Sequence, residues 1–127
     1  MIVHNNANVK IEYNQIKKRL TQTWTGFIQS NEFRKAIDAT VEFAEKNLVQ
    51  TIVSDTLAQG VVKPEDTEYA SAVMPKLVAR GLKAMAFVIP ENIFTQLSLK
   101  KFADNEKSDV VQYFRSTQEA NVWLDKV

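Results

Sequence analysis

Asp55 and Thr56 are the residues of this sequence whose types and position most suggest chemistry. They follow Val49–Ser54, a short run rich in β-branched residues that is typical of a buried strand. In open α/β sheets, ligands and partners meet the protein at the carboxyl ends of such strands. Both side chains, with Gln59 in the loop that closes at Gly60, are therefore candidates for contact with a ligand or partner. In the alternative interpretation they hydrogen-bond to nearby backbone N–H groups and shape the turn.

Other groups with catalytic or metal-binding potential have structural explanations. Glu65, Asp66 and Glu68 lie next to Pro64, which suits the first position of a helix, and carboxylates there interact favourably with the helix dipole. His4 is the one histidine, and its predicted edge segment is a poor position for a Ser-His-acid triad. We therefore expect neither catalytic residues nor a metal site.

The composition removes several further classes of site. The chain has no cysteine, which excludes disulfides, thiol catalysis and zinc–thiolate centres. Gly26, Gly60 and Gly81 are far apart, so the sequence has neither a P-loop nor a dinucleotide-binding fingerprint. The net charge of +1 gives no reason to expect nucleic acid or an anionic membrane as a partner. No cofactor is predicted.

Length and composition favour one globular domain over residues 1–127. With 45% hydrophobic and 24% charged residues, the chain can bury a core without disulfides or metals. No apolar run approaches the length of a membrane span, and residues 1–6 lack the apolar region of a secretion signal. We therefore expect a cytoplasmic protein.

The first elements are predicted to form a β-hairpin. Val9–Tyr13 alternates apolar and polar residues with period two, and Leu20–Phe27 has the composition of a strand. Met1–His4 is a candidate for a short edge strand. Trp24 is expected to pack under a helix, the alternative being an outward ring that stacks on a ligand. An amphipathic helix follows, with Ser30 as its expected N-cap.

Helices and strands alternate in the rest of the chain. Pro64 begins a helix that Pro75 should kink or break just ahead of itself. Ala84–Ile89 is continuously apolar, which indicates a central parallel strand covered on both faces. Val110–Phe114 is a last strand, and the capping box Ser116–Glu119 begins a closing helix.

The segment after Pro90 is the second candidate for interaction. Ile93, Phe94 and Leu97 share one helical face, whereas Leu99 and Phe102 point to a different side if the helix continues. Such a distribution fits deep burial. It also fits an apolar patch that a partner, or a second copy in a homodimer, would cover.

The order of elements predicts an α/β fold. We expect a single-domain mixed sheet of about five strands with a starting hairpin, then alternating helices and strands, with about four helices. If Val49–Ser54 and Ala84–Ile89 are neighbours, their carboxyl ends bring Asp55 and Thr56 close to Pro90 and Glu91.

This arrangement resembles the SpoIIAA-like (STAS/SEC14-type) domains. The residues that carry the resemblance are Trp24-Thr25-Gly26-Phe27, Ser30-Asn31-Glu32-Phe33-Arg34, Asp55, Pro64-Glu65-Asp66, Pro75, Gly81-Leu82-Lys83, Phe114, Glu119-Ala120 and Trp123-Leu124. The resemblance extends over nearly the whole chain. It implies a four-helix fold with a mixed sheet, and protein–protein regulation or the binding of small or lipid-like ligands rather than catalysis.

One motif of that family is incomplete. Its anti-sigma-factor antagonists have Asp-Ser-Ser-Gly at the end of this strand, and phosphorylation of a serine there acts as a switch. The corresponding residues are Asp55-Thr56-Leu57-Ala58, so Thr56 could accept phosphate, but Leu57 replaces the second serine and the glycine is absent. The resemblance is therefore closer to the uncharacterised branch of the family.

Our leading hypothesis is a non-enzymatic regulatory or protein-interaction module that acts through Asp55–Gly60 and Ile93–Phe102. The main alternative is a carrier of a small apolar or lipid-like ligand, with a pocket between the sheet and the Phe94 helix. An enzyme that uses Asp55 with Glu65 or Asp66 is a third hypothesis, and it requires a cleft with a perturbed carboxylate.

Overall fold

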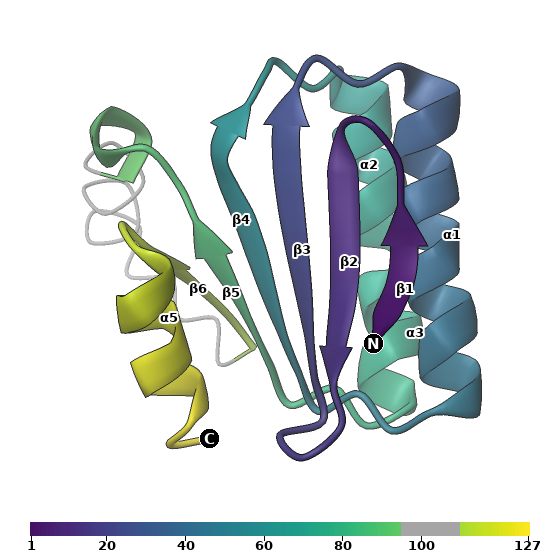
Figure 1. The fold of residues 1–127 in the computed structure, drawn as a ribbon, viewed down its shortest axis with the longest axis vertical. Coiled ribbons are helices and arrows are strands. Elements are labelled where there is room, and N and C mark those ends of the chain that lie inside the picture. The colour runs from purple at the N-terminus through teal and green to yellow at the C-terminus, as the bar shows by residue number, and fades with distance from the viewer. Residues whose placement is uncertain (95–109) are drawn as a thin grey trace.

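Six strands form one mixed sheet, and their order in space is their order along the chain (Figure 1). The computed structural model describes residues 1–94 and 110–127. The strands are β1 (Ile2–Asn5), β2 (Val9–Asn14), β3 (Arg19–Gly26), β4 (Thr51–Gln59), β5 (Ala84–Val88) and β6 (Val111–Phe114). The first three strands pair antiparallel, and β3 to β6 pair parallel. The hairpin and the mixed α/β sheet are therefore confirmed.

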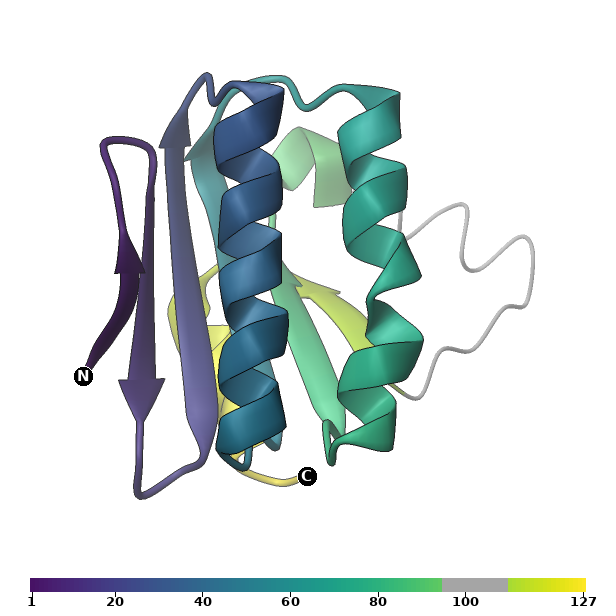
Figure 2. The same ribbon diagram turned by 90° about the vertical axis from the view of Figure 1, so that its right-hand side faces the viewer.

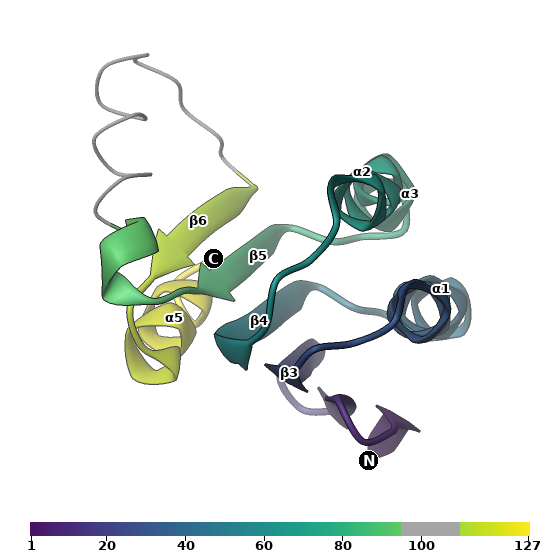
Figure 3. The same cartoon turned by 90° about the horizontal axis from the view of Figure 1, so that it is seen from above.

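Helices cover the two faces of this sheet unequally. The helices are α1 (Ser30–Lys46), α2 (Pro64–Ala72), α3 (Met74–Ala79) and α5 (Thr117–Leu124), and residues 91–94 are also helical. Helices α1, α2 and α3 stand on one face (Figure 2). Seen from above, α5 lies on the opposite face beside β5 and β6 (Figure 3). In the part of the chain that the structure describes, one face therefore has a broad helical layer, and the other is covered by the short helix α5.

The larger core lies between the sheet and α1. Leu20 and Ile52 are fully buried there, and the Trp24 ring packs against Phe33 with the ring centroids 5.1 Å apart. The Trp24 indole N–H donates to Ser54 Oγ at 3.0 Å, which satisfies its polar edge. The prediction that Trp24 packs under a helix is confirmed.

The smaller core lies between α5 and strands β4 to β6. It consists of Val53, Ala84, Ala86, Val88, Ala120 and Leu124, with Phe114 and Trp123 packed against it. Continuous apolarity in β5 thus has the predicted cause, because its side chains alternate between two buried faces.

Two details differ from the sequence predictions. The sheet has a sixth strand because the candidate edge segment does pair with β2, from Ile2 to Asn5. Ser30 is not an N-cap, since α1 is preceded by Gln29 and has no side-chain cap. The Ser30 hydroxyl instead donates to Asp66 Oδ2 of α2 at 2.7 Å. The predicted break ahead of Pro75 is confirmed, because α2 ends at Ala72 and α3 begins at Met74.

Candidate functional site at the carboxyl edge of the sheet

Strand β4 extends further than the sequence indicated. It continues to Gln59, so Asp55 and Thr56 lie within the strand rather than in a turn after it. Pairing with β5 ends at Asp55 opposite Val88, whereas pairing with β3 continues to Gln59 opposite Gly26. The expected turn at Asp55 is therefore wrong, because β3 supplies a pairing partner four residues beyond the point where β5 ends.

A β-bulge lies at the same place. Thr23 pairs with Asp55 and Thr25 pairs with Ala58, so the single residue between them on β3 faces Thr56 and Leu57 together. A bulge adds one residue to a strand and changes the direction of the groups that follow it. Beyond Asp55, the backbone of β4 is consequently shifted relative to β3.

Asp55 and Thr56 both hydrogen-bond to the backbone where β4 and β5 separate. The Thr56 hydroxyl donates to the Val88 carbonyl at 2.8 Å, and Asp55 Oδ1 accepts from the Leu57 N–H at 3.1 Å. These side chains satisfy groups that lose their ladder partners as β5 turns away. Asp55 thus bonds to a nearby backbone N–H, as the structural interpretation has it, whereas Thr56 bonds to a carbonyl of the neighbouring strand β5.

Two glycines bring the loops after β3 and β4 into contact (Figure 1). The Gly60 N–H donates to the Gly26 carbonyl at 2.9 Å, and a Cβ on Gly60 would lie 3.2 Å from the Gly26 carbonyl and from the Phe27 nitrogen. Gly26 has a φ of +65°, which disfavours side chains there. The next residue in each loop, Phe27 or Val61, is therefore presented at the same end of the sheet.

Large apolar side chains are exposed at this end. Phe27 is 61% exposed, Leu57 46% and Val61 84%. We call Phe27, Asp55, Leu57, Gln59 and Val61 the carboxyl-edge surface. Leu57 lies within the predicted interaction segment Asp55–Gly60, whereas Phe27 and Val61 were not predicted as part of a site. The local signal for these two residues was that each directly follows a glycine.

The second candidate segment is described only in part. Ile93 is 42% exposed, and the Arg115 guanidinium carbon lies 5.3 Å from the centre of the Phe94 ring. Arg115 also forms an ion pair with Glu91 at 3.6 Å. Leu97, with Leu99 and Phe102, lies outside the described residues. Ile93 is thus accessible for an interaction, while Phe94 contacts a cation.

Asp66 has a structural role that the sequence did not show. Its side chain is buried, and besides Ser30 it accepts from Arg34 Nε at 3.1 Å. The Ser30 hydrogen bond lowers the pKa of the Asp66 carboxyl; burial opposes this effect and Arg34 adds to it. Asp66 therefore links α2 to the first turns of α1.

Tyr69 adds two contacts between the same helices. The Arg34 guanidinium carbon lies 4.8 Å from the centre of the Tyr69 ring, and the Tyr69 hydroxyl donates to Asp38. That hydrogen bond raises the pKa of the Tyr69 hydroxyl. Across residues 1–94 and 110–127, no three His, Asp or Glu side chains gather in a group that could hold a metal ion.

Comparison with known proteins gives a structural match. An uncharacterized protein of the DUF3478 family with a SpoIIAA-like fold, from Shewanella loihica PV-4, aligns over 95% of this chain and 98% of its own, with a TM-score of 0.62. The chain has a SpoIIAA-like fold. Sequence identity to that protein is 13%, so the match establishes the fold alone. No family model matches the sequence, and no curated protein matches it.

The SpoIIAA-like fold confirms the architecture that the resemblance implied, including the element order and the helical layers. In β4 of this fold, the Thr56 hydroxyl is bonded to the Val88 carbonyl. Within the described residues, no helix is both long and apolar enough to cross a membrane.

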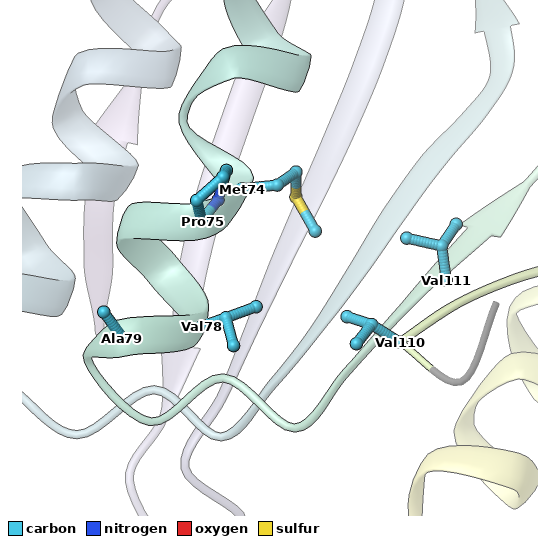
Figure 4. A pocket seen from close by; sticks show the side chains of 6 residues that line it. All are labelled: Met74, Pro75, Val78, Ala79, Val110 and Val111. Atoms are coloured by element: carbon cyan, nitrogen blue, oxygen red, sulfur yellow. The ribbon is translucent and has the colours of Figure 1, made fainter.

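An apolar groove lies at the other end of this SpoIIAA-like domain (Figure 4). Its volume is about 500 Å³, and its lining consists of Met74, Pro75, Val78, Ala79, Val110 and Val111. These residues come from α3 and from the start of β6. The groove is thus separate from Phe94, beside which the sequence analysis expected a pocket.

Proposed function

We propose that this SpoIIAA-like chain is a regulatory protein-interaction module whose partner binds the carboxyl-edge surface. The observation that carries the proposal is the exposure of Phe27, Leu57 and Val61 at one end of the sheet, by 61%, 46% and 84%. Neighbouring exposed apolar side chains are typical of protein-binding surfaces. The hydrogen bond between Gly60 and Gly26 supports the proposal, because it holds together the two loops that carry Phe27 and Val61 before binding.

The proposed role is non-enzymatic. The third hypothesis required carboxylates with perturbed pKa values in a cleft, yet Asp66 is buried in hydrogen bonds to Ser30 and Arg34. Asp55 is bonded to the backbone of its own strand. Asp55 and Asp66, two of the three carboxylates that the hypothesis names, thus have structural partners, which favours a binding role.

The test compares a surface variant with a matched control. Leu57→Ser combined with Val61→Ser removes two apolar contacts, whereas Ile16→Ser removes an equally apolar side chain that is 94% exposed in the turn between β2 and β3. Proteins captured from a lysate by each immobilised variant are identified, and their binding is measured again with purified protein. We expect a partner that binds the wild type and Ile16→Ser equally and binds the double variant about tenfold or more weakly.

Two results would contradict the proposal. One is a wild-type protein that binds no purified candidate. The other is a double variant that binds as tightly as the control. A second copy of the chain is included among the candidates, and sedimentation equilibrium of the wild type at high concentration tests it directly. If the protein is strictly monomeric in that experiment, a homodimer is excluded.

A second function is favoured by the groove, namely carriage of a small apolar ligand. Its volume lies within the roughly 300–1,000 Å³ range of ligand pockets, and its lining residues are all apolar. Native mass spectrometry of freshly purified protein should then show a bound ligand that Val78→Asp loses. Val122→Asp is the matched control, because Val122 is 51% exposed on α5. Protein without adduct in every preparation would contradict this function.

A further inference from the structure

Among the described residues, the end of β4 has a strand on one side only. Its pairing with β5 stops at Asp55, while its pairing with β3 continues to Gln59. Within residues 1–94 and 110–127, no strand pairs with residues 56–59 on the side where β5 lay. Leu57 is 46% exposed and Gly60 is also exposed, so this stretch is accessible to another molecule.

The direction of the backbone groups follows from one hydrogen bond. The Gly60 N–H points toward β3, because it donates to the Gly26 carbonyl. Successive backbone N–H groups of an extended chain point to opposite sides. The Gln59 N–H and carbonyl, and the Leu57 carbonyl, are therefore directed away from β3. The Leu57 N–H is occupied by Asp55 Oδ1.

We propose that the partner binds as an extended segment that pairs with β4 at Leu57–Gln59, in a short strand addition. This inference rests on the proposed function and specifies what the partner presents to the site. The Gln59 N–H is a donor between two acceptors, the Leu57 and Gln59 carbonyls, and the backbone of another extended chain can pair with all three. Exposed Leu57, on β4 itself, would contact the apolar side chains of that segment.

The same features would limit unwanted pairing by the open stretch. Bulges and charged side chains are devices that protect sheet edges from unwanted association. Here the bulge at Thr56 and Leu57 shortens the open edge, and Asp55 occupies one of its N–H groups. The site accordingly fits a few residues of extended chain and excludes a long strand.

Substitution at Gln59 separates backbone pairing from side-chain contact. Gln59→Pro removes the N–H, and Gln59→Ala keeps it while removing the same side chain. The probe is a set of short peptides selected on the wild-type protein from a phage-displayed random library, with affinities measured by titration calorimetry. We expect Gln59→Pro to lose about tenfold in affinity and Gln59→Ala to lose less than about threefold. Thermal unfolding checks that both variants fold.

A second measurement leaves the protein unchanged, in case Gln59→Pro does not fold. Single N-methyl groups are placed along the selected peptide. Strand pairing predicts that affinity falls at alternate positions, because alternate N–H groups point toward β4. An irregular dependence, or peptides that are not enriched over a selection without protein, would overturn the strand addition.

The two proposals fail in different ways. If Leu57→Ser with Val61→Ser loses binding while Gln59→Pro binds like Gln59→Ala, strand addition is wrong and the interaction surface stands. If none of these variants changes the binding of partner or peptide, both proposals are wrong.

Discussion

The two faces of the sheet are stabilised in different ways. On the α1 face, large side chains such as Leu20, Ile52 and Phe33 interlock, and the aromatic ring of Trp24 is buried among them. On the α5 face, the sheet presents small residues, Ala84 and Ala86, to a helix of eight residues. Less apolar surface is therefore available there, since hydrophobic stabilisation scales with the buried area.

Polar contacts supplement the packing of the α5 face. Arg19 is 5% exposed, and it donates to Thr51 Oγ1 at 2.9 Å and to Asn121 Oδ1 at 2.8 Å. Its third contact is an ion pair with Asp125 at 2.9 Å, and Lys17 contacts the same carboxylate at 3.2 Å. The contact between the sheet and α1 therefore depends mainly on apolar packing, whereas the contact between the sheet and α5 also depends on charge.

Two leucines test this comparison with the same substitution. Leu20 on the α1 face and Leu124 on α5 are both buried, at 0% and 2% exposure. We expect Leu20→Ala to lower the free energy of unfolding by about 4 kcal/mol and Leu124→Ala by about 2 kcal/mol, because a site at a helix end can close around the cavity. Urea denaturation measures both. Equal losses would contradict the difference between the faces.

Ala86 tests whether small residues determine how closely α5 packs. Ala86 is fully buried on the α5 face. Ala86→Leu adds volume where no space is available, and overpacking of this kind destabilises by about 1–3 kcal/mol. Ala72→Leu is the control, since Ala72 is exposed on α2. If Ala86→Leu left the free energy of unfolding unchanged in the same denaturation series, α5 could move away from the sheet without loss of stability.

Arg19 tests the contribution of the polar contacts. Arg19→Met keeps much of the side-chain volume but removes three partners, so we expect a loss of about 1–2 kcal/mol. The loss should be local. Hydrogen exchange should accelerate in residues 117–124 and remain unchanged in β2. Uniform acceleration throughout the chain would mean that Arg19 stabilises the whole sheet instead.

Acid should weaken two polar clusters. One joins Asp125 to Lys17 and Arg19, and the other joins Asp66 to Ser30 and Arg34. The pKa of the Asp125 carboxyl lies below its ordinary value of 3.8, owing first to its hydrogen bond from Lys17 and then to the one from Arg19. The pKa of Asp66 is also lowered, chiefly by Ser30. A lowered folded-state pKa stabilises the fold above the unfolded value, and this contribution is lost as the pH falls through the folded value.

The pH dependence can be assigned by substitution. Asp125→Asn should reduce the loss of stability as the pH falls, and it should change amide hydrogen exchange in α5. Asp66→Asn should instead affect the contact between α1 and α2. Unfolding curves between about pH 6 and pH 2 measure this. Parallel acid slopes in the wild type and both variants would show that other carboxylates dominate.

Local patterns in the sequence predicted much of the fold and little of the candidate site. The alternation in Val9–Tyr13 and the break ahead of Pro75 were readable, because each depends on neighbouring residues. The Ser30 hydroxyl was misassigned as a cap because its partner, Asp66, is 36 residues away. The end of β4 was misplaced because β3 pairs with it beyond a bulge, and no local signal distinguishes such a bulge from a turn. Contact between Gly26 and Gly60 is similarly non-local, so the glycine before Phe27 and the one before Val61 could not show that the two side chains lie at the same end of the sheet.

His4 offers the smallest test, at the margin of the α1 face. It lies on β1 opposite the buried Ile11, and its Nε2 atom is buried without a hydrogen-bond partner. A buried polar atom without a partner destabilises a fold, and an apolar side chain of similar size removes that penalty. We therefore expect His4→Leu to raise the free energy of unfolding by about 1 kcal/mol at neutral pH. A loss of stability in urea denaturation would instead show that Nε2 is satisfied in solution, and that polar contacts also matter on the face held by packing.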